Sequence, residues 1–204
     1  MRLFLVRHGE TESNRLGLAL GRADVPLNER GRWQAQRLAR ALAAVPLAAV
    51  YSSPLSRALD TARAIASEHG LPVQVEEGLI EMDIGETEGL SFAEVRTRFP
   101  EFLEAWVGAS GPDQAMPGGE RLSDVQARAW ETVQAIAARH DEEAACAVTH
   151  NFVILSVLTR VLGMELANFR WLRHSVGAIS VLELRPDHAL VLSLNDTCHL
   201  SGED

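Results

Sequence analysis

The segment LFLVRHGETESN, residues 3–14, decides the fold. It opens with four apolar residues, Leu3–Val6, which predict a buried strand. Arg7 and His8 follow at once, and two adjacent basic groups do not close a buried strand unless a ligand requires them. Because ligands of open α/β sheets bind beyond the carboxyl ends of the strands, this junction predicts a binding site.

Strands and helices alternate along the rest of the chain. Short apolar runs predict further strands, and apolar residues at helical spacing predict helices between them. The patterns Ser91-x-x-Glu94 and Ser123-x-x-Gln126 resemble capping boxes that open two more helices, the second running to about Arg139. Strands are expected at Ala48–Ser52, Val73–Val75, Ala144–Thr149, Ala178–Leu184 and Ala189–Leu194, and helices at Glu29–Val45, Ser56–His69 and Phe152–Leu162.

This alternation predicts the α/β class, as a three-layer α/β/α sandwich with a mostly parallel sheet. The chain has 204 residues, 47% of them hydrophobic, so a single domain over residues 1–204 is expected. Residues 99–121 contain Trp106 and two breaks rich in glycine and proline. We expect this segment to be an insertion or lid over the sheet edge.

The charge composition restricts the partners. A net charge of −9 argues against nucleic acid and anionic membranes, and the apolar stretches are too short to span a bilayer. Without a signal-peptide pattern, a cytoplasmic location is expected. All 19 basic residues are arginine, so the lysine of a P-loop, a kinase site or a Schiff base is missing. Arginine, histidine, backbone N–H groups or a metal would have to hold any bound phosphate.

The predicted strand ends bring basic side chains to one sheet edge. Arg7 and His8 follow the first strand, Arg57 the second, and His150 the strand over 144–149. Arginine binds phosphoryl oxygens bidentately, one neutral imidazole can attack phosphorus, and the second can stabilise the transition state. Taken singly, each side chain is more often structural or solvated. Metal binding is the competing use of two histidines, but no HxH or HxxxH spacing supports it, so no metal is expected.

Several segments, taken in order, resemble the histidine phosphatase superfamily, in its phosphoglycerate-mutase-like branch. RHGETESN is similar to the nucleophile motif of that family, SSPLSRALDTA to its second arginine motif, and LIEMDIGETEG to its general-acid segment. VTH resembles the second-histidine motif, and GRADVPLNERGRWQA, PGGE and NDTCHL resemble further family segments. The resemblance spans nearly the whole chain and implies the phosphoglycerate-mutase-like fold.

The resemblance also implies a role for each matched residue. His8 is the expected nucleophile that becomes phosphohistidine. Glu81 is the expected proton donor to the leaving oxygen and, later, the base for the attacking water. Its apolar neighbours in the sequence are compatible with a raised pKa for this carboxyl group. The expected phosphoryl ligands are Arg7, Arg57, His150 and Asn14.

Two positions depart from the pattern of the family and bear on the substrate. Leu20-Gly21 stands where many relatives have Gln-Gly, and Asn151 stands where many have glycine. All of these residues are expected near the substrate. Gly108–Glu120 contains no arginine, whereas the mutases carry paired basic residues in their insertion for a second phosphate. A hydrolase is therefore favoured over a mutase.

The expected activity is a phosphomonoesterase that hydrolyses a small phosphate ester through phosphohistidine, without metal or cofactor. An apolar rim of Leu20, Trp106 and Met116 favours a leaving group that is not strongly anionic. α-Ribazole phosphate, a sugar phosphate and phosphoserine remain open as substrates. The alternatives are a phosphoglycerate mutase and a non-catalytic phosphate-binding module. A homodimer is left open.

Overall fold

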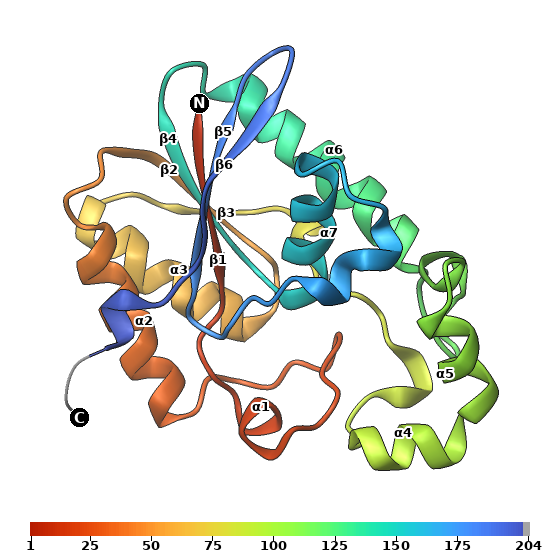
Figure 1. Cartoon of the computed structure of the whole chain (residues 1–204). Coiled ribbons are helices and arrows are strands. Elements are labelled where there is room, and N and C mark those ends of the chain that lie inside the picture. The colour runs from red at the N-terminus through yellow and green to blue at the C-terminus, as the bar shows by residue number, and fades with distance from the viewer. Residues whose placement is uncertain (202–204) are drawn as a thin grey trace.

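The computed structural model describes residues 1–201 and places a six-stranded sheet at the centre of the molecule (Figure 1). The strand order is β3-β2-β4-β1-β5-β6. The first four of these strands are parallel to one another. Strand β5 pairs antiparallel with β1, and β6 pairs antiparallel with β5 at the edge of the sheet. The predicted mostly parallel sheet is confirmed. The strands are β1 (Arg2–Arg7), β2 (Leu47–Ser52), β3 (Val73–Val75), β4 (Ala144–Thr149), β5 (Ile179–Leu184) and β6 (Ala189–Asp196).

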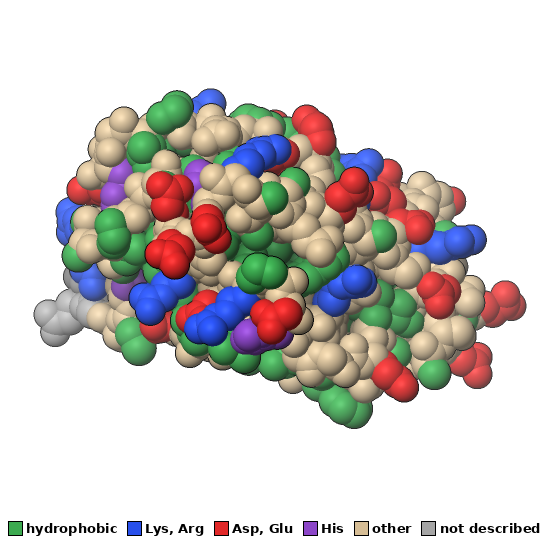
Figure 2. Space-filling view, turned by 90° about the horizontal axis from the view of Figure 1, so that it is seen from above, with side chains coloured by type: hydrophobic (Ala, Val, Ile, Leu, Met, Phe, Trp, Pro, Cys, Tyr) green, Lys and Arg blue, Asp and Glu red, His purple; other side chains and the backbone are tan. Residues whose placement is uncertain are grey.

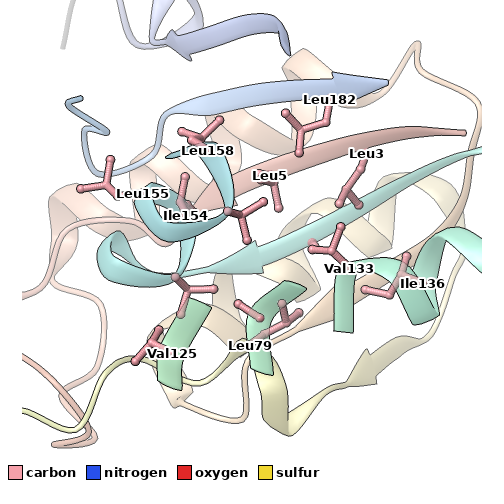
Figure 3. Packing of buried hydrophobic residues seen from close by; sticks show 14 of the residues in the cluster. Leu3, Leu5, Leu79, Val125, Val133, Ile136, Ile154, Leu155, Leu158 and Leu182 are labelled. Carbon is pink, nitrogen blue, oxygen red and sulfur yellow. The ribbon is translucent and has the colours of Figure 1, made fainter. Parts of the chain in front are cut away.

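Two pairs of helices cover the two faces of the sheet, which confirms the three-layer architecture (Figure 1). Helices α2 (Glu29–Leu42) and α3 (Ser56–His69) pack on one face, against Val6, Val50 and Val148. Helices α6 (Leu122–Arg139) and α7 (Asn151–Val161) pack on the other face, where Figure 3 shows Leu3, Leu5 and Leu182 of the sheet meeting Val133 and Ile154. Strand residues alternate between the faces, so β1 contributes to both cores.

The remaining elements are short and lie in the connections. They are α1 (Glu12–Leu16), α4 (Phe92–Arg98), α5 (Pro100–Val107) and the 3-10 helices η1 (Glu77–Leu79), η2 (Gly85–Thr87), η3 (Gly111–Asp113), η4 (Leu166–Trp171) and η5 (Cys198–Leu200). Within residues 1–201, no helix has both the length and the apolar character needed to cross a bilayer. Figure 2 views the end of the molecule at which β1 begins, and acidic and basic side chains are interspersed there.

Helix α7 begins and ends one residue earlier than predicted, at Asn151 and Val161, and two further helix boundaries also differ from the sequence predictions. Helix α2 ends at Leu42 and not at Val45, because Val45 precedes Pro46 and a residue before proline disfavours the helical conformation. The capping box predicted at Ser123 is wrong, since α6 begins at Leu122 and its N-cap, Arg121, makes no side-chain capping bond. Burial of Leu122 in the core sets that start. The predicted capping box of Ser91 and Glu94 is confirmed at the start of α4.

Candidate active site

His8 lies directly beyond the carboxyl end of β1 and is 3% exposed. Its Nδ1 atom lies 2.7 Å from the carbonyl oxygen of Gly9. Because a carbonyl can only accept, Nδ1 carries the proton and Nε2 keeps its lone pair. Burial, with the charges of Arg57 and Arg7, holds the pKa of His8 well below its usual value. The ring is therefore neutral and its free nitrogen is a competent nucleophile.

His150 lies beyond the end of β4, and its ring centroid is 5.0 Å from that of His8. The Nε2 atom of His150 is 2.7 Å from Ser53 Oγ, and Ser53 lies beyond the end of β2. Burial is the main cause that holds the pKa of His150 well below its usual value. We assign the one proton of the neutral ring to Nδ1, because the Ser53 hydroxyl accepts from the backbone N–H of Leu55 and has no acceptor other than Nε2 among the described residues.

Arg57 comes from the first turn of α3 and is fully buried. Its two terminal nitrogens donate to the carbonyl oxygens of Ala23 and Gly21, at 2.7 and 2.6 Å. These bonds fix the guanidinium against the loop that precedes α2. Burial lowers the pKa of Arg57, but an arginine remains charged at neutral pH. The positive charge is thus held inside the protein.

Arg7 is the last residue of β1, and its Nη1 atom donates to two acceptors. One is Asn151 Oδ1, at 3.1 Å, and the other is the carbonyl oxygen of His174, at 2.6 Å. Burial lowers the pKa of Arg7 to about 10. Asn151 therefore lies beside a second charged arginine, at the first position of α7.

Besides Nδ1 of the neighbouring His174, three buried nitrogen atoms of the residues expected to bind the phosphoryl group have no hydrogen-bond partner within residues 1–201. They are Arg7 Nε, Arg57 Nε and His150 Nδ1. Leaving one buried donor unsatisfied costs about 1–3 kcal/mol. An anion with several oxygens, such as a phosphoryl group, would satisfy all three donors and would balance the two guanidinium charges.

Glu81 is brought to the same edge from the connection after β3, beyond the 3-10 helix η1. It is 3% exposed, and its carboxylate accepts from the backbone N–H groups of Met82, at 2.8 Å, and Phe152, at 3.3 Å. The second bond places the carboxyl group at the first turn of α7, beside Asn151. Burial raises the pKa of Glu81, which outweighs the opposing effects of these bonds and of Arg7 and Arg57. A carboxyl group with a raised pKa suits proton donation.

The other residues predicted from the sequence, Asn14, Leu20 and Gly21, form no hydrogen bond with His8 or His150 within residues 1–201. Asn14 lies on α1, where its Oδ1 accepts from the backbone N–H and the hydroxyl of Thr11. The carbonyl of Gly21 is an acceptor for Arg57, as described. Leu20 precedes Gly21 and is partly exposed. Backbone hydrogen bonds from Ala19 and Gly89 join this segment to residues 89–90.

Two neighbours of the site were missed by sequence reasoning. Ser53 falls within the SSPLSR segment, but no spacing rule identifies it as the partner of His150. His174 is buried and its Nε2 lies 2.9 Å from Ser180 Oγ. Burial lowers the pKa of His174 to about 4. It follows no strand or motif, so the sequence carries no signal for it.

Gly9 and Gly31 let the loop that carries His8 lie directly against the start of α2. A Cβ atom on Gly9 would be 2.4 Å from the carbonyl oxygen of Gly31, and one on Gly31 would be 2.0 Å from that of Glu10. Only glycine permits such an approach. The backbone that carries His8 is therefore packed against a helix on one side and hydrogen-bonded to β4 on the other, through His8 N and Thr149 O.

Two neutral histidines, the fully buried Arg57 and the partly buried Arg7 at the carboxyl edge of a parallel sheet define a site suited to phosphoryl chemistry. The chain belongs to the histidine phosphatase superfamily, whose branch 1 model matches residues 3–197. It is a phosphatase that acts on phosphate monoesters.

Named relatives cover almost all of the chain. It is 34% identical to phosphoserine phosphatase 1 of Hydrogenobacter thermophilus over 200 residues, which are 98% of this chain and 94% of the relative. It is 32% identical to the adenosylcobalamin/alpha-ribazole phosphatase of Escherichia coli over 96% of each chain. The solved structure of YhfR from Bacillus stearothermophilus superimposes with a TM-score of 0.91, at 33% identity, over 98% of this chain and 99% of that one.

Proposed function

We propose that this protein is a cytoplasmic, metal-independent phosphomonoesterase that works through a phosphohistidine on His8. The observation that carries the proposal is the pairing of a neutral His8 with three unsatisfied N–H donors on Arg7, Arg57 and His150. The histidine supplies the nucleophile, and the arginines supply the charge that a metal would otherwise provide.

The reaction proceeds in two steps. In the first, the lone pair of His8 Nε2 forms a bond to phosphorus, the P–O bond to the leaving group breaks, and Glu81 gives its proton to the departing oxygen. In the second, the Glu81 carboxylate takes a proton from water while the water oxygen bonds to phosphorus. The N–P bond breaks, its electron pair returns to His8, and inorganic phosphate leaves.

The proposed substrate is a small ester whose leaving group carries little negative charge. Arg22 is the support: its Nε donates to the carbonyl oxygen of Glu81, yet its charge is already balanced by Glu120, at 2.9 Å, and Asp83, at 3.9 Å. A second phosphate, as in a mutase, gains little from a cation so engaged. Phosphoserine and α-ribazole phosphate, for which relatives are named, both fit this class.

Two of the three residues expected to form an apolar rim around the substrate, Trp106 and Met116, pack against other apolar side chains. Met116 is only 9% exposed and packs in the core, and Trp106 packs against Phe102 and Phe169. Residues 99–121 are also hydrogen-bonded to the rest of the fold at two points. Arg170 donates to the carbonyl oxygen of Trp106, and the backbone N–H of Glu86 donates to that of Pro117. We therefore propose that this segment is a fixed cover of a single domain and not a hinged lid.

The proposal is tested by measuring phosphate release from p-nitrophenyl phosphate and from a panel of metabolite phosphates, with and without EDTA. We expect turnover that EDTA leaves unchanged and vanadate inhibits. Acid quenching during turnover should trap acid-labile phosphate on the protein. Activity that is lost with EDTA and restored by one divalent metal would overturn metal independence. No release from any ester would favour a binding module, and turnover that requires added bisphosphoglycerate would favour a mutase.

A further inference from the structure

Arg128 reaches from α6 to the backbone of the segment that carries Glu81. Its Nη1 donates to the carbonyl oxygens of Gly78 and Ile80, at 2.9 and 2.6 Å, and its Nη2 donates to that of Glu81, at 3.2 Å. One side chain thus holds three carbonyl groups within four residues of chain. A planar guanidinium with five donors can do this, whereas an ammonium cannot reach the same set.

Glu120 completes the arrangement by pairing with two arginines and one backbone group. Its carboxylate accepts from Arg128 Nε and Nη2, both at 3.3 Å, and from Arg22 Nη2, at 2.9 Å. It also accepts from the backbone N–H of Asp83, at 2.8 Å. Arg22 Nε also donates to the carbonyl oxygen of Glu81, at 3.3 Å. The carbonyl group of Glu81 is thus held by two guanidinium groups, which the carboxylate of Glu120 joins.

The segment needs such support because it lies outside regular secondary structure. Residues 80–84 connect η1 to η2, so their backbone groups have no ladder of their own, and the carbonyl groups of Ile80 and Glu81 and the N–H of Asp83 bond to side chains. The loop of Glu120 can approach closely because a Cβ atom on Gly119 would be only 2.3 Å from the carbonyl oxygen of Asp83. Backbone therefore packs directly on backbone beside Glu81.

We propose that Arg128, joined to Glu120, is a positioning residue that holds the Glu81 carboxyl group where it can protonate the leaving oxygen. This inference rests on the proposed role of Glu81 as the general acid. Proton transfer requires heavy atoms within hydrogen-bond distance, and small displacements of a reacting group are costly in rate. Arg128 contacts the backbone of Glu81 and not its carboxylate. It therefore acts on the position of the carboxyl group and does not form an ion pair with it.

The proposal predicts a loss that depends on the leaving group. An aryl phosphate departs as a stable anion and needs little protonation, whereas an alkyl phosphate departs as a poor alkoxide and needs the proton. We therefore expect Arg128→Met to lower the burst rate on phosphoserine by at least about tenfold and that on p-nitrophenyl phosphate by less than about threefold. Arg128→Lys should restore the phosphoserine burst only in part.

The pH profile provides a second readout that a purely structural role would not move. Burial raises the pKa of Glu81, and a displaced segment would expose the carboxyl group and lower that pKa toward its usual value. The donor must be protonated, so the burst on phosphoserine falls as pH rises through this pKa. In Arg128→Met, this fall is expected at lower pH than in the wild type.

The controls separate the inference from the proposed function. Arg139→Met removes an arginine of the same helix that pairs with Glu76 at an exposed site, and it should leave both bursts unchanged. Should Arg128→Met fail to fold, Glu120→Gln weakens the same contacts and should give the same selective loss. Equal losses on both esters in Arg128→Met and Glu120→Gln, together with a selective loss in Glu81→Gln, would overturn the positioning role alone. Equal losses in Glu81→Gln would overturn the general-acid assignment and this inference with it.

Discussion

The strand ends that carry the two histidines and the segment that carries Glu81 hold their side chains by different means. His8 and His150 follow β1 and β4, which pair in parallel along their whole length, up to Arg7 and Thr149. Glu81 is separated from the end of β3 by η1, and its segment depends on the side chains of Arg128, Arg22 and Glu120. The first region is fixed by the sheet, whereas the second is assembled from long-range polar contacts.

This difference separates two parts of the proposed chemistry. The strand ends would bind the phosphoryl group, which is common to every substrate, so damage there should affect all esters alike. The Glu81 segment would serve the leaving group, which varies between substrates, so damage there should be selective. The four variants below test that division, beginning with the largest expected effect.

His8→Ala should abolish turnover on every ester, because it removes the proposed nucleophile itself. Turnover is measured by phosphate release, and the phosphoenzyme by acid quenching, which should trap phosphate on the wild type only. His188→Ala, at an exposed histidine of the β5–β6 turn, is the matched control and should keep full activity. Undiminished turnover in His8→Ala would remove the basis of the proposed mechanism.

Glu81→Gln should lower the phosphohistidine burst by roughly 10²–10⁴ for phosphoserine and far less for p-nitrophenyl phosphate. Burial raises the pKa of Glu81, so the wild-type carboxyl keeps its proton to higher pH than an ordinary glutamate, and the phosphoserine burst falls as pH rises through that pKa. Rapid-quench kinetics on both esters provide the measurement, with Glu86→Gln at an exposed neighbour as control.

Equal burst losses on the two esters would mean that Glu81 does not donate the proton. Glu10 would then be the next candidate, since it is close to His8 in the sequence. Its carboxylate already accepts from Asn28 Nδ2, at 2.8 Å, which ties it to the start of α2.

Arg57→Ala should lower kcat/KM on both esters by about 10²–10³, the usual effect of losing one preorganised charged donor. Arg57→Lys should recover only part of this, because an ammonium cannot reproduce the two bonds to Gly21 and Ala23. Arg63→Ala on the same helix removes an exposed arginine paired with Asp60 and serves as control. A loss below about threefold in Arg57→Ala would place Arg57 outside the transition state.

Ser53→Ala should have the smallest effect. It removes one neutral hydrogen bond to His150, worth about 0.5–1.5 kcal/mol, which corresponds to a loss of roughly two- to tenfold in kcat/KM. Because the phosphoryl group is shared, the loss should be equal on aryl and alkyl esters. Ser67→Ala, at an exposed serine of α3, is the control. A loss confined to phosphoserine would show that Ser53 acts on the leaving group, against the proposed division of the site.

The same division explains what could be predicted from the sequence. The bounds of α3, β3 and β4 were predicted correctly because local signals mark them: an apolar run for β4, two valines that flank Gln74 for β3, and Gly70 with a positive φ at the end of α3. The strand-end residues Arg7, His8 and His150 could be located because a parallel sheet brings strand ends together.

The parts that could not be predicted depend on distant contacts. Arg128 lies 47 residues from Glu81 in the chain and reads there as one more polar residue of an amphipathic helix. The start of α6 was missed for the same reason, since burial of Leu122 outweighed the local pattern around Ser123. Motifs therefore located the residues proposed to react, but not the side chains that hold the Glu81 segment in place.

The contact between Gly9 and Gly31 limits which substitutions these two positions can accept during evolution. A glycine inside a helix costs about 1 kcal/mol relative to alanine, so selection for helix stability alone would favour replacing Gly31. Any side chain there meets the backbone of Glu10, and any side chain on Gly9 meets the backbone of Gly31. Neither position can change alone without displacing the loop of His8. The start of α2 is therefore held at lower helix stability for as long as a lineage keeps the loop that carries His8.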